Sequence, residues 1–174
     1  AWNKLFKISL FSDKELKFEK GKIYEDLRLI LKIYLKAHTI SFIKEPLYHY
    51  VIRNGSIMTS SGIKKNLDII SAFDDVIDYY KKEDKYEIFK NELEFLVIEH
   101  LLIATIVRVL SISRYKDVKN NILPYLKYIN QNFPNYKKNS YISLLSKNKK
   151  IILFLINHKQ FILLKMLINL RRRK

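Results

Sequence analysis

The first clear pattern along the chain is an apolar stripe with a helical period. Its members fall at i, i+3, i+4, i+7 and i+8: Leu27, Ile30, Leu31, Tyr34 and Leu35. This spacing places them on one side of an α-helix, so the pattern predicts a helix that follows Gly21 and ends near His38. Glu25 and Asp26 then lie in its first turn, where the helix dipole favours negative charge.

Two shorter segments with alternating polarity predict β-structure. Residues 39–43 alternate and are rich in β-branched and aromatic residues, which favours a strand. Pro46 permits a second strand over residues 47–52, because proline can occupy the first position of a strand. Residues 53–56 contain Asn-Gly and predict a turn. Residues 2–11 predict either a short strand or a turn-like entry.

The helical period returns after residue 64 and continues to the end of the chain. One stripe predicts a helix over about residues 64–80: Leu67, Ile70, Phe73, Ile77 and Tyr80. A second, longer helix begins near residue 86 and is apolar on nearly all sides over residues 101–110, which predicts a buried end. A third helix is expected over residues 117–131, with a kink near Pro124, and a short helical turn over residues 141–145.

Composition excludes several classes of protein. Of the 174 residues, 48% are hydrophobic and 29% are charged, which argues against disorder. Three glycines and three prolines leave few tight turns and favour long helices. The absence of cysteine excludes disulfides and Cys-type zinc sites, and it is consistent with a reducing cytoplasm.

The formal net charge of +16 is concentrated in the last third of the chain. Residues 119–174 carry 13 basic residues and no acidic residue. Within this region, residues 147–174 combine short aliphatic runs with basic ends, and Lys159 and Lys165 interrupt the runs too often for a transmembrane span. Two interpretations remain open: a helix that lies in an anionic membrane surface, or a C-terminal helix packed on the preceding helices with a solvated basic tip.

A high isoelectric point also fits nucleic-acid binding. The value of about 9.8 is typical of that class. Against it, the basic residues of the tail are mixed with large aliphatic residues, and the chain contains no recognised nucleic-acid reader motif. The alternative to an enzyme is therefore a non-enzymatic basic helical module that docks on an anionic membrane or on nucleic acid.

Four short motifs in a fixed order resemble a known family. They are WNKLF at residues 2–6, GKIYED at 21–26, EPLYHY at 45–50 and RNGSIM at 53–58. In this order and spacing, over roughly residues 1–82, the chain resembles the C-terminal half of bacterial family 2 glycosyltransferases of the GT-A fold. Such enzymes build surface polysaccharides from nucleotide-sugars.

The resemblance implies a fold and a domain organisation. The fold class is mainly α with a small β component. Residues 1–60 would form the acceptor-side end of a GT-A α/β domain, and residues 61–174 an all-helical C-terminal region with a basic amphipathic tail. The nucleotide-binding half of the family is expected before Trp2, so we expect this chain to be part of a longer polypeptide and to be inactive alone.

The resemblance also implies the chemistry. Asp26 would be the general base that takes the acceptor hydroxyl proton, and Glu25 would orient the acceptor or tune Asp26. Trp2 would be an aromatic platform near the acceptor sugar, Lys4 would be a substrate-binding residue, and Arg53 and Ser56 could contact the donor diphosphate. A divalent metal, Mg or Mn, is implied on the leaving diphosphate, with its main ligands outside this chain and His49 as the one candidate ligand within it.

The chain departs from the family in two ways. Val51 stands where arginine is common, which removes one phosphate or acceptor contact. No Asp-x-Asp metal motif is present, and the adjacent Asp74 and Asp75 do not supply that spacing. The expected partners are a nucleotide-sugar donor, a glycan or lipid-linked acceptor and an anionic membrane surface. The expected location is the cytoplasm or the inner face of the membrane.

Overall fold

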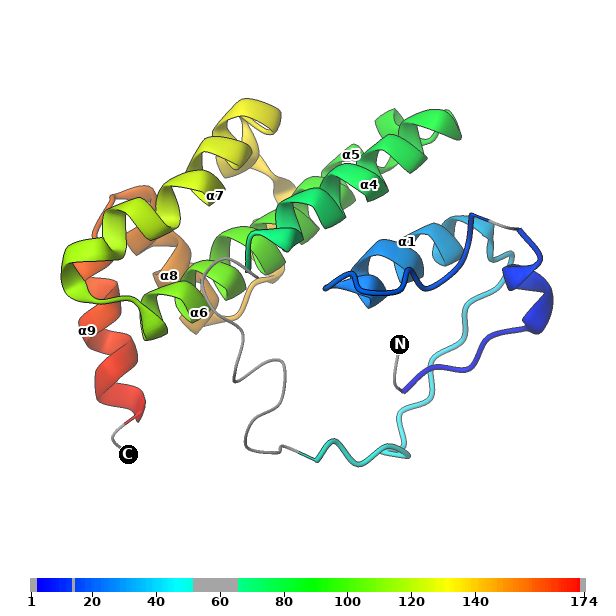
Figure 1. Cartoon of the computed structure of the whole chain (residues 1–174), viewed down its shortest axis with the longest axis horizontal. Helices are drawn as coiled ribbons and strands as arrows, with labels where there is room; N and C mark the ends of the chain where they lie inside the picture. The colour runs from blue at the N-terminus through cyan, green and yellow to red at the C-terminus, as the bar shows by residue number, and fades with distance from the viewer. Residues whose placement is uncertain (1–2, 14, 52–65, 173–174) are drawn as a thin grey trace. The chain divides into compact units, whose positions relative to one another are not determined.

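A computed structural model describes residues 3–13, 15–51 and 66–172 of the chain (Figure 1). The chain folds as two compact units, Ala1–Asp84 and Lys85–Lys174. The predicted domain boundary at residues 60 and 61 lies outside the described residues and stays a prediction. Each unit has its own apolar core.

The first unit is built on a pair of packed helices. Its elements are the 3₁₀ turn η1 (Ile8–Phe11) and the helices α1 (Glu25–Lys36) and α4 (Asp68–Lys82). The core of the unit is formed mainly by Leu29 and Ile33 of α1 and by Phe73 and Val76 of α4, all of which are buried. The helix predicted over residues 64–80 is confirmed as α4, and the predicted entry over residues 2–11 forms the turn η1 instead of a strand.

The face that α1 buries differs from the predicted stripe. Ile30 of the stripe is buried, but Leu29 and Ile33, which lie outside it, are almost fully buried, and Tyr34 of the stripe is exposed. The buried face also includes Arg28 and Lys32. The reason is electrostatic: α4 offers hydrogen-bond acceptors and a carboxylate to these two cations, so α1 is rotated toward them.

The two predicted strands are not formed. Residues 37–51 are irregular, and no β-strand occurs in the described ranges 3–13, 15–51 and 66–172. A strand needs a partner to pair its backbone groups. The backbone hydrogen bonds from residues 37–51 are local: Ala37 N–H donates to the Tyr34 carbonyl at 3.3 Å, and Leu47 N–H donates to the Glu45 carbonyl at 2.9 Å. The mainly helical class is therefore confirmed, whereas the small β component and the α/β end of a GT-A domain are wrong for the described residues.

The second unit is a helical bundle around one long helix. Its α- and π-helical elements are α5 (Tyr86–Leu96), η2 (Val97–Thr105), α6 (Ile106–Ile112), α7 (Val118–Asn132), α8 (Lys147–Asn157) and α9 (Phe161–Arg172). Three 3₁₀ turns connect them: η3 (Tyr115–Asp117), η4 (Tyr136–Lys138) and η5 (Ser140–Leu144). The first three helical elements are continuous, and α7, α8 and α9 pack against them.

The continuous helix Tyr86–Ile112 is the core of this unit. Its 27 residues are long and apolar enough to cross a membrane by length and composition alone. Half of its most apolar window is buried inside the structure. The predicted burial of residues 101–110 is confirmed, since Leu101, Leu102, Ile106 and Leu110 are all fully buried.

The middle of the long helix is π-helical, and the residue pattern explains why. Buried residues recur every four positions: Leu93, Val97, Leu101, Thr105 and Val109. In an α-helix, four residues advance about 400°, so such a row drifts by about 40° at each step. A π-helix has more residues per turn, and η2 therefore keeps the row on one side of the helix.

Candidate functional site

The chain enters α1 through two residues with left-handed backbone. Gly21 has φ 80° and Tyr24 has φ 60°. A non-glycine residue in this region carries about 1–2 kcal/mol of strain, so Tyr24 must be held by other contacts. Its hydroxyl donates to Oδ1 of the buried Asn66 at 3.3 Å. This contact fixes the point at which α1 begins.

Glu25 and Asp26 occupy the first turn of α1, as predicted. Glu25 is exposed and Asp26 is half-buried. Asp26 Oδ1 accepts the backbone N–H of Leu27 at 2.8 Å, which orients the carboxylate at the helix start. The positive end of the helix dipole stabilises both negative charges by about 0.3–1 kcal/mol each.

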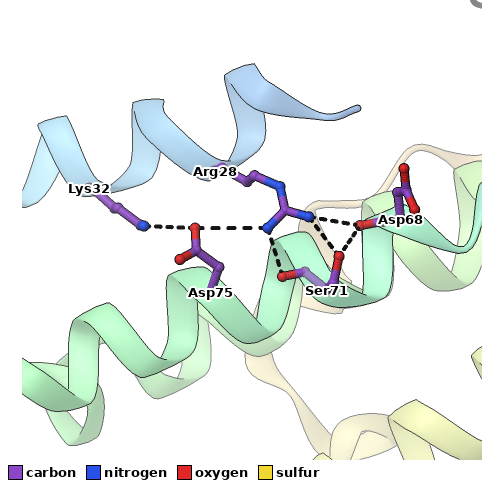
Figure 2. Close-up of polar contacts among 5 residues, drawn as sticks. All are labelled: Arg28, Lys32, Asp68, Ser71 and Asp75. Atoms are coloured by element: carbon purple, nitrogen blue, oxygen red, sulfur yellow. Dashed lines mark hydrogen bonds and ion pairs between the residues drawn. The ribbon is translucent and has the colours of Figure 1, made fainter. Parts of the chain in front are cut away.

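Arg28 locks the first turns of α1 onto α4. Its guanidinium donates to the Ser71 carbonyl at 3.0 Å and to Ser71 Oγ at 2.6 Å, with a longer contact to the Asp68 carbonyl at 3.5 Å (Figure 2). The side chain is almost completely buried. Because Arg28 lies within one turn of Asp26, these hydrogen bonds restrict the orientation of the catalytic candidate.

Lysine–carboxylate pairs continue the contact along the two helices. Lys32 Nζ lies 2.7 Å from Asp75 Oδ2 (Figure 2), and Lys36 Nζ lies 2.5 Å from Glu83 Oε2. The Glu83 hydrogen bond raises the pKa of Lys36 above its usual value. Arg28, Lys32 and Lys36 thus lie four residues apart on α1, and each faces an acceptor on α4 or at its C-terminal cap.

Tyr80 adds a hydrogen bond between neutral groups to the contact between α1 and α4. Its hydroxyl donates to the Leu31 carbonyl at 2.9 Å. Burial, followed by the nearby Tyr79, raises the pKa of Tyr80 to about 12. The phenol therefore stays protonated at neutral pH and remains a donor.

A small hollow lies beside Glu25. Its lining is rich in charged side chains: Glu15, Lys17, Glu19, Glu25, Arg28, Leu29, Lys32 and Asp75. The space is about 10 Å³, close to the smallest that holds one water molecule. The hollow is too small for a sugar, so a substrate that reached Glu25 and Asp26 would lie on the surface of this unit.

No hydrogen bond or ion pair joins the other predicted site residues within the described ranges, Lys4 and His49, to Glu25 or Asp26. Lys4 is exposed and its Nζ donates to Asn3 Oδ1 at 2.9 Å. His49 is exposed in the irregular segment 37–51. Trp2, Arg53 and Ser56 lie outside the described residues, and their predicted roles stay predictions.

The described residues do not provide a metal site. Within residues 3–13, 15–51 and 66–172, no group of three or more His, Asp or Glu side chains is placed to hold a metal ion. His49 therefore does not belong to such a group within these ranges. The divalent metal stays a prediction.

The sequence interpretation missed Arg28, Lys32 and Asp75. The signal was present in part, since Arg28, Lys32 and Lys36 follow one another at intervals of four residues. Such a row predicts a basic stripe on a helix. Its partner on α4 is about 40 residues away in the sequence, and local spacing does not identify it.

Comparison with known proteins adds a partial relationship. No family model matches the chain, and no solved structure matches it. Glycosyltransferase GlyA of Streptococcus pneumoniae serotype 4 is 42% identical over 57 residues, which are 33% of this chain and 8% of that protein. Putative glycosyltransferase EpsH of Bacillus subtilis is 26% identical over 103 residues, which are 58% of this chain and 30% of that protein.

The chain spans less than a third of the length of each of these relatives. At this coverage the matches do not establish the family 2 or GT-A assignment. They relate part of the chain to glycosyltransferases.

Proposed function

We propose that this chain is part of a glycosyltransferase of the family 2 type, which moves a sugar from a nucleotide-sugar to an acceptor hydroxyl with inversion. Its products would be surface polysaccharide or lipid-linked glycan. The observation that carries the proposal is the acidic first turn of α1, in which Asp26 is oriented by a backbone N–H and the helix is locked to α4. The partial similarity to GlyA and EpsH supports the reaction class.

Asp26 is the general base in this proposal. The acceptor oxygen forms a bond to the anomeric carbon, and the bond from that carbon to the diphosphate oxygen breaks. The acceptor hydroxyl proton passes to the Asp26 carboxylate, and the nucleoside diphosphate leaves with the bonding electrons. General-base assistance of this kind contributes typically about 10²–10⁴-fold to the rate.

Glu25 has a separate role beside the base. It is the more exposed of the two carboxylates and lines the hollow next to Asp26. This position suits a hydrogen-bond acceptor for a second hydroxyl of the acceptor sugar. A Glu25→Gln change would then weaken acceptor binding more than it slows turnover.

The rest of the reaction requires groups that the described residues do not supply. We place Trp2 on the acceptor side, Arg53 and Ser56 near the donor diphosphate and Lys4 in contact with substrate, as the resemblance implies. The GT-A assignment also stays a prediction. We expect the chain to act within a longer polypeptide at the cytoplasmic side of the membrane.

The test is turnover of nucleotide-sugars by the intact polypeptide that contains this sequence, measured as released nucleoside diphosphate. Asp26→Asn should lower kcat at least about 100-fold while the polypeptide stays folded. The matched control is Asp78→Asn, the same change at an exposed carboxylate of α4, which should keep full turnover. Full activity of the Asp26→Asn enzyme would rule out Asp26 as the base.

A further inference from the structure

Helix α9 exposes a continuous aliphatic face. Five residues at i, i+1, i+4, i+5 and i+8 form it, with between 40% and 61% of each residue exposed: Ile162, Leu163, Met166, Leu167 and Leu170. No polar residue interrupts this set, which we call the α9 face. Single exposed apolar residues are ordinary on a protein surface, whereas contiguous patches mark interaction sites.

The opposite side of α9 is fixed in the bundle, so the α9 face is not its packing surface. Phe161 and Leu164 are buried. Lys165 is also buried, and its Nζ donates to the Leu110 carbonyl at 2.7 Å and lies 5.0 Å from the centre of the Tyr115 ring. These contacts with the long helix and the turn that follows it set the rotation of α9 and leave the five aliphatic residues outward.

The segment of sequence that contains the α9 face carries charge of one sign. Lys159 precedes α9, the sequence RRRK ends the chain, and residues 119–174 contain 13 basic residues and no acidic residue. On α8, exposed Lys147 and Lys150 share an outward side with exposed Ile151 and Phe154. Exposed apolar residues with exposed lysines beside them therefore occur on α8, which directly precedes α9 along the chain (Figure 1).

These features select one class of partner. Nucleic acid would satisfy the positive charge but would give the α9 face no apolar surface to contact. A second copy of the chain would cover the apolar residues. It would also bring together two units that repel each other, because each carries 18 basic and 5 acidic residues. An anionic bilayer offers both an apolar interior and negative headgroups.

We propose that α9 lies in the surface plane of an anionic membrane, with Ile162, Leu163, Met166, Leu167 and Leu170 in the boundary between headgroups and acyl chains. The flanking basic residues are attracted to the lipid phosphates. Each Lys or Arg near such a surface contributes about 1 kcal/mol. The inference goes beyond the proposed transferase activity and does not depend on Asp26.

The experiment is flotation of the full chain with large unilamellar vesicles. One set contains phosphatidylcholine alone, and the other contains equal parts of phosphatidylcholine and phosphatidylglycerol. The chain should float with the anionic vesicles and not with the neutral ones. Binding should weaken as the NaCl concentration rises, because salt screens charge attraction.

Two double variants separate the α9 face from general surface hydrophobicity. Leu163→Gln with Leu170→Gln should lower the partition coefficient about tenfold, equivalent to about 1.4 kcal/mol, which is the order expected from completing the burial of two half-exposed leucines. The matched control is Leu123→Gln with Leu144→Gln, which changes two exposed leucines of the same unit outside α9 and should leave the partition unchanged. Far-UV circular dichroism establishes that both variants fold.

Several outcomes would overturn the proposal. Equal partition of the two double variants would show that the α9 face makes no contact with lipid. Equal flotation with neutral and anionic vesicles would show that charge does not select the surface. If the chain did not float with vesicles but formed dimers that the α9 variant lost, the α9 face would be assigned to a second copy of the chain. If it did not float but bound single-stranded DNA, the surface would be assigned to nucleic acid. Asp26→Asn should not change flotation, so this test and the turnover assay fail independently.

Discussion

Asp75 is the carboxylate shared by two cations of α1, and its neutralisation tests how α1 is held. Lys32 Nζ lies 2.7 Å and Arg28 NH1 lies 4.0 Å from Asp75 Oδ2. The Lys32 and Arg28 side chains are 11% and 8% exposed, whereas Asp75 is 32% exposed. Asp75→Asn keeps the shape of the side chain and removes its charge, which leaves two nearly buried cations without a counter-ion.

The expected cost follows from two opposing terms. At 2.7 Å and an effective dielectric constant of about 20, the Lys32–Asp75 attraction is about 6 kcal/mol. Desolvation of the two charges offsets several kcal/mol of this. Removal of one partner from a fully buried pair costs about 3–5 kcal/mol, and the partial exposure of Asp75 reduces this, so we expect Asp75→Asn to destabilise the first unit by about 2–3 kcal/mol.

A double-mutant cycle isolates the pair. Lys32→Met removes the cation and keeps most of the apolar volume, so with Asp75→Asn already present it should cost little more. We expect a coupling energy of about 1–2 kcal/mol. The hydrogen bonds from Arg28 to Ser71 remain in all four proteins, so they do not enter the difference.

Native-state hydrogen exchange of the α1 and α4 amides is the appropriate assay. The chain has two units, and a single unfolding curve would mix their transitions. The control cycle uses Lys81 and Asp78, an exposed pair on α4 separated by 3.9 Å, for which we expect a coupling below about 0.5 kcal/mol. If the Lys32–Asp75 coupling did not exceed the control value, the electrostatic account of how α1 is fixed would be refuted.

Two further predictions concern hydrogen bonds in the two cores. The pKa of Tyr80 is raised to about 12 from about 10 in the unfolded chain, so its contribution to stability is complete below pH 10 and is lost as the pH rises to 12. Tyr80→Phe should therefore reduce the fall in unfolding free energy of the first unit over that window. The measurement is a urea titration at each pH, followed by the methyl NMR signals of Ile33 and Val76 so that it reports the first unit alone, and an unchanged fall would contradict the prediction. Asn139 is buried and donates to the Asn91 carbonyl at 2.9 Å and to Glu94 Oε2 at 2.8 Å. Asn139→Ala should lower the unfolding free energy of the second unit by about 2–3 kcal/mol, measured by native-state hydrogen exchange of the α5 and α6 amides. Unchanged exchange would show that water replaces these hydrogen bonds at no cost.

Local periodicity was sufficient to predict the helices. Burial of α4 and of residues 101–110 depends on which side chains recur every three or four positions, and that information is contained within each segment. The placement of Glu25 and Asp26 in the first turn of α1 was predicted for the same reason and is confirmed. Their chemical roles depend on substrates and stay predictions.

The two strand predictions were wrong because alternation reports only half of what a strand requires. Residues 39–43 and 47–51 have suitable side chains, but a strand is stable only when a neighbour pairs its N–H and C=O groups. No such neighbour is present among the described residues. Composition within a segment carries no information about that neighbour.

The orientation of α1 was mispredicted for a related reason. Ile30 of the predicted stripe is buried, but Arg28 and Lys32, which lie outside the stripe, are buried with it. Their acceptors are Ser71 and Asp75, about 40 residues away. Interactions between distant segments therefore decide both the face of the helix and the position of the candidate site.

The π-helical segment η2 has a consequence for how this chain can change in evolution. A π-helical turn holds one residue more than the α-helical turn it replaces. Deletion of one residue within Val97–Thr105 is therefore absorbed when that turn returns to α-helical hydrogen bonding, which keeps Val109 and Leu110 on the buried side of the helix. Deletion of one residue at the start of α6 has no such outlet and would rotate every later side chain by about 100°, so that Ser111 would enter the buried place of Leu110. We therefore expect relatives that keep this bundle to vary in length within η2 and to retain the number of residues of α6.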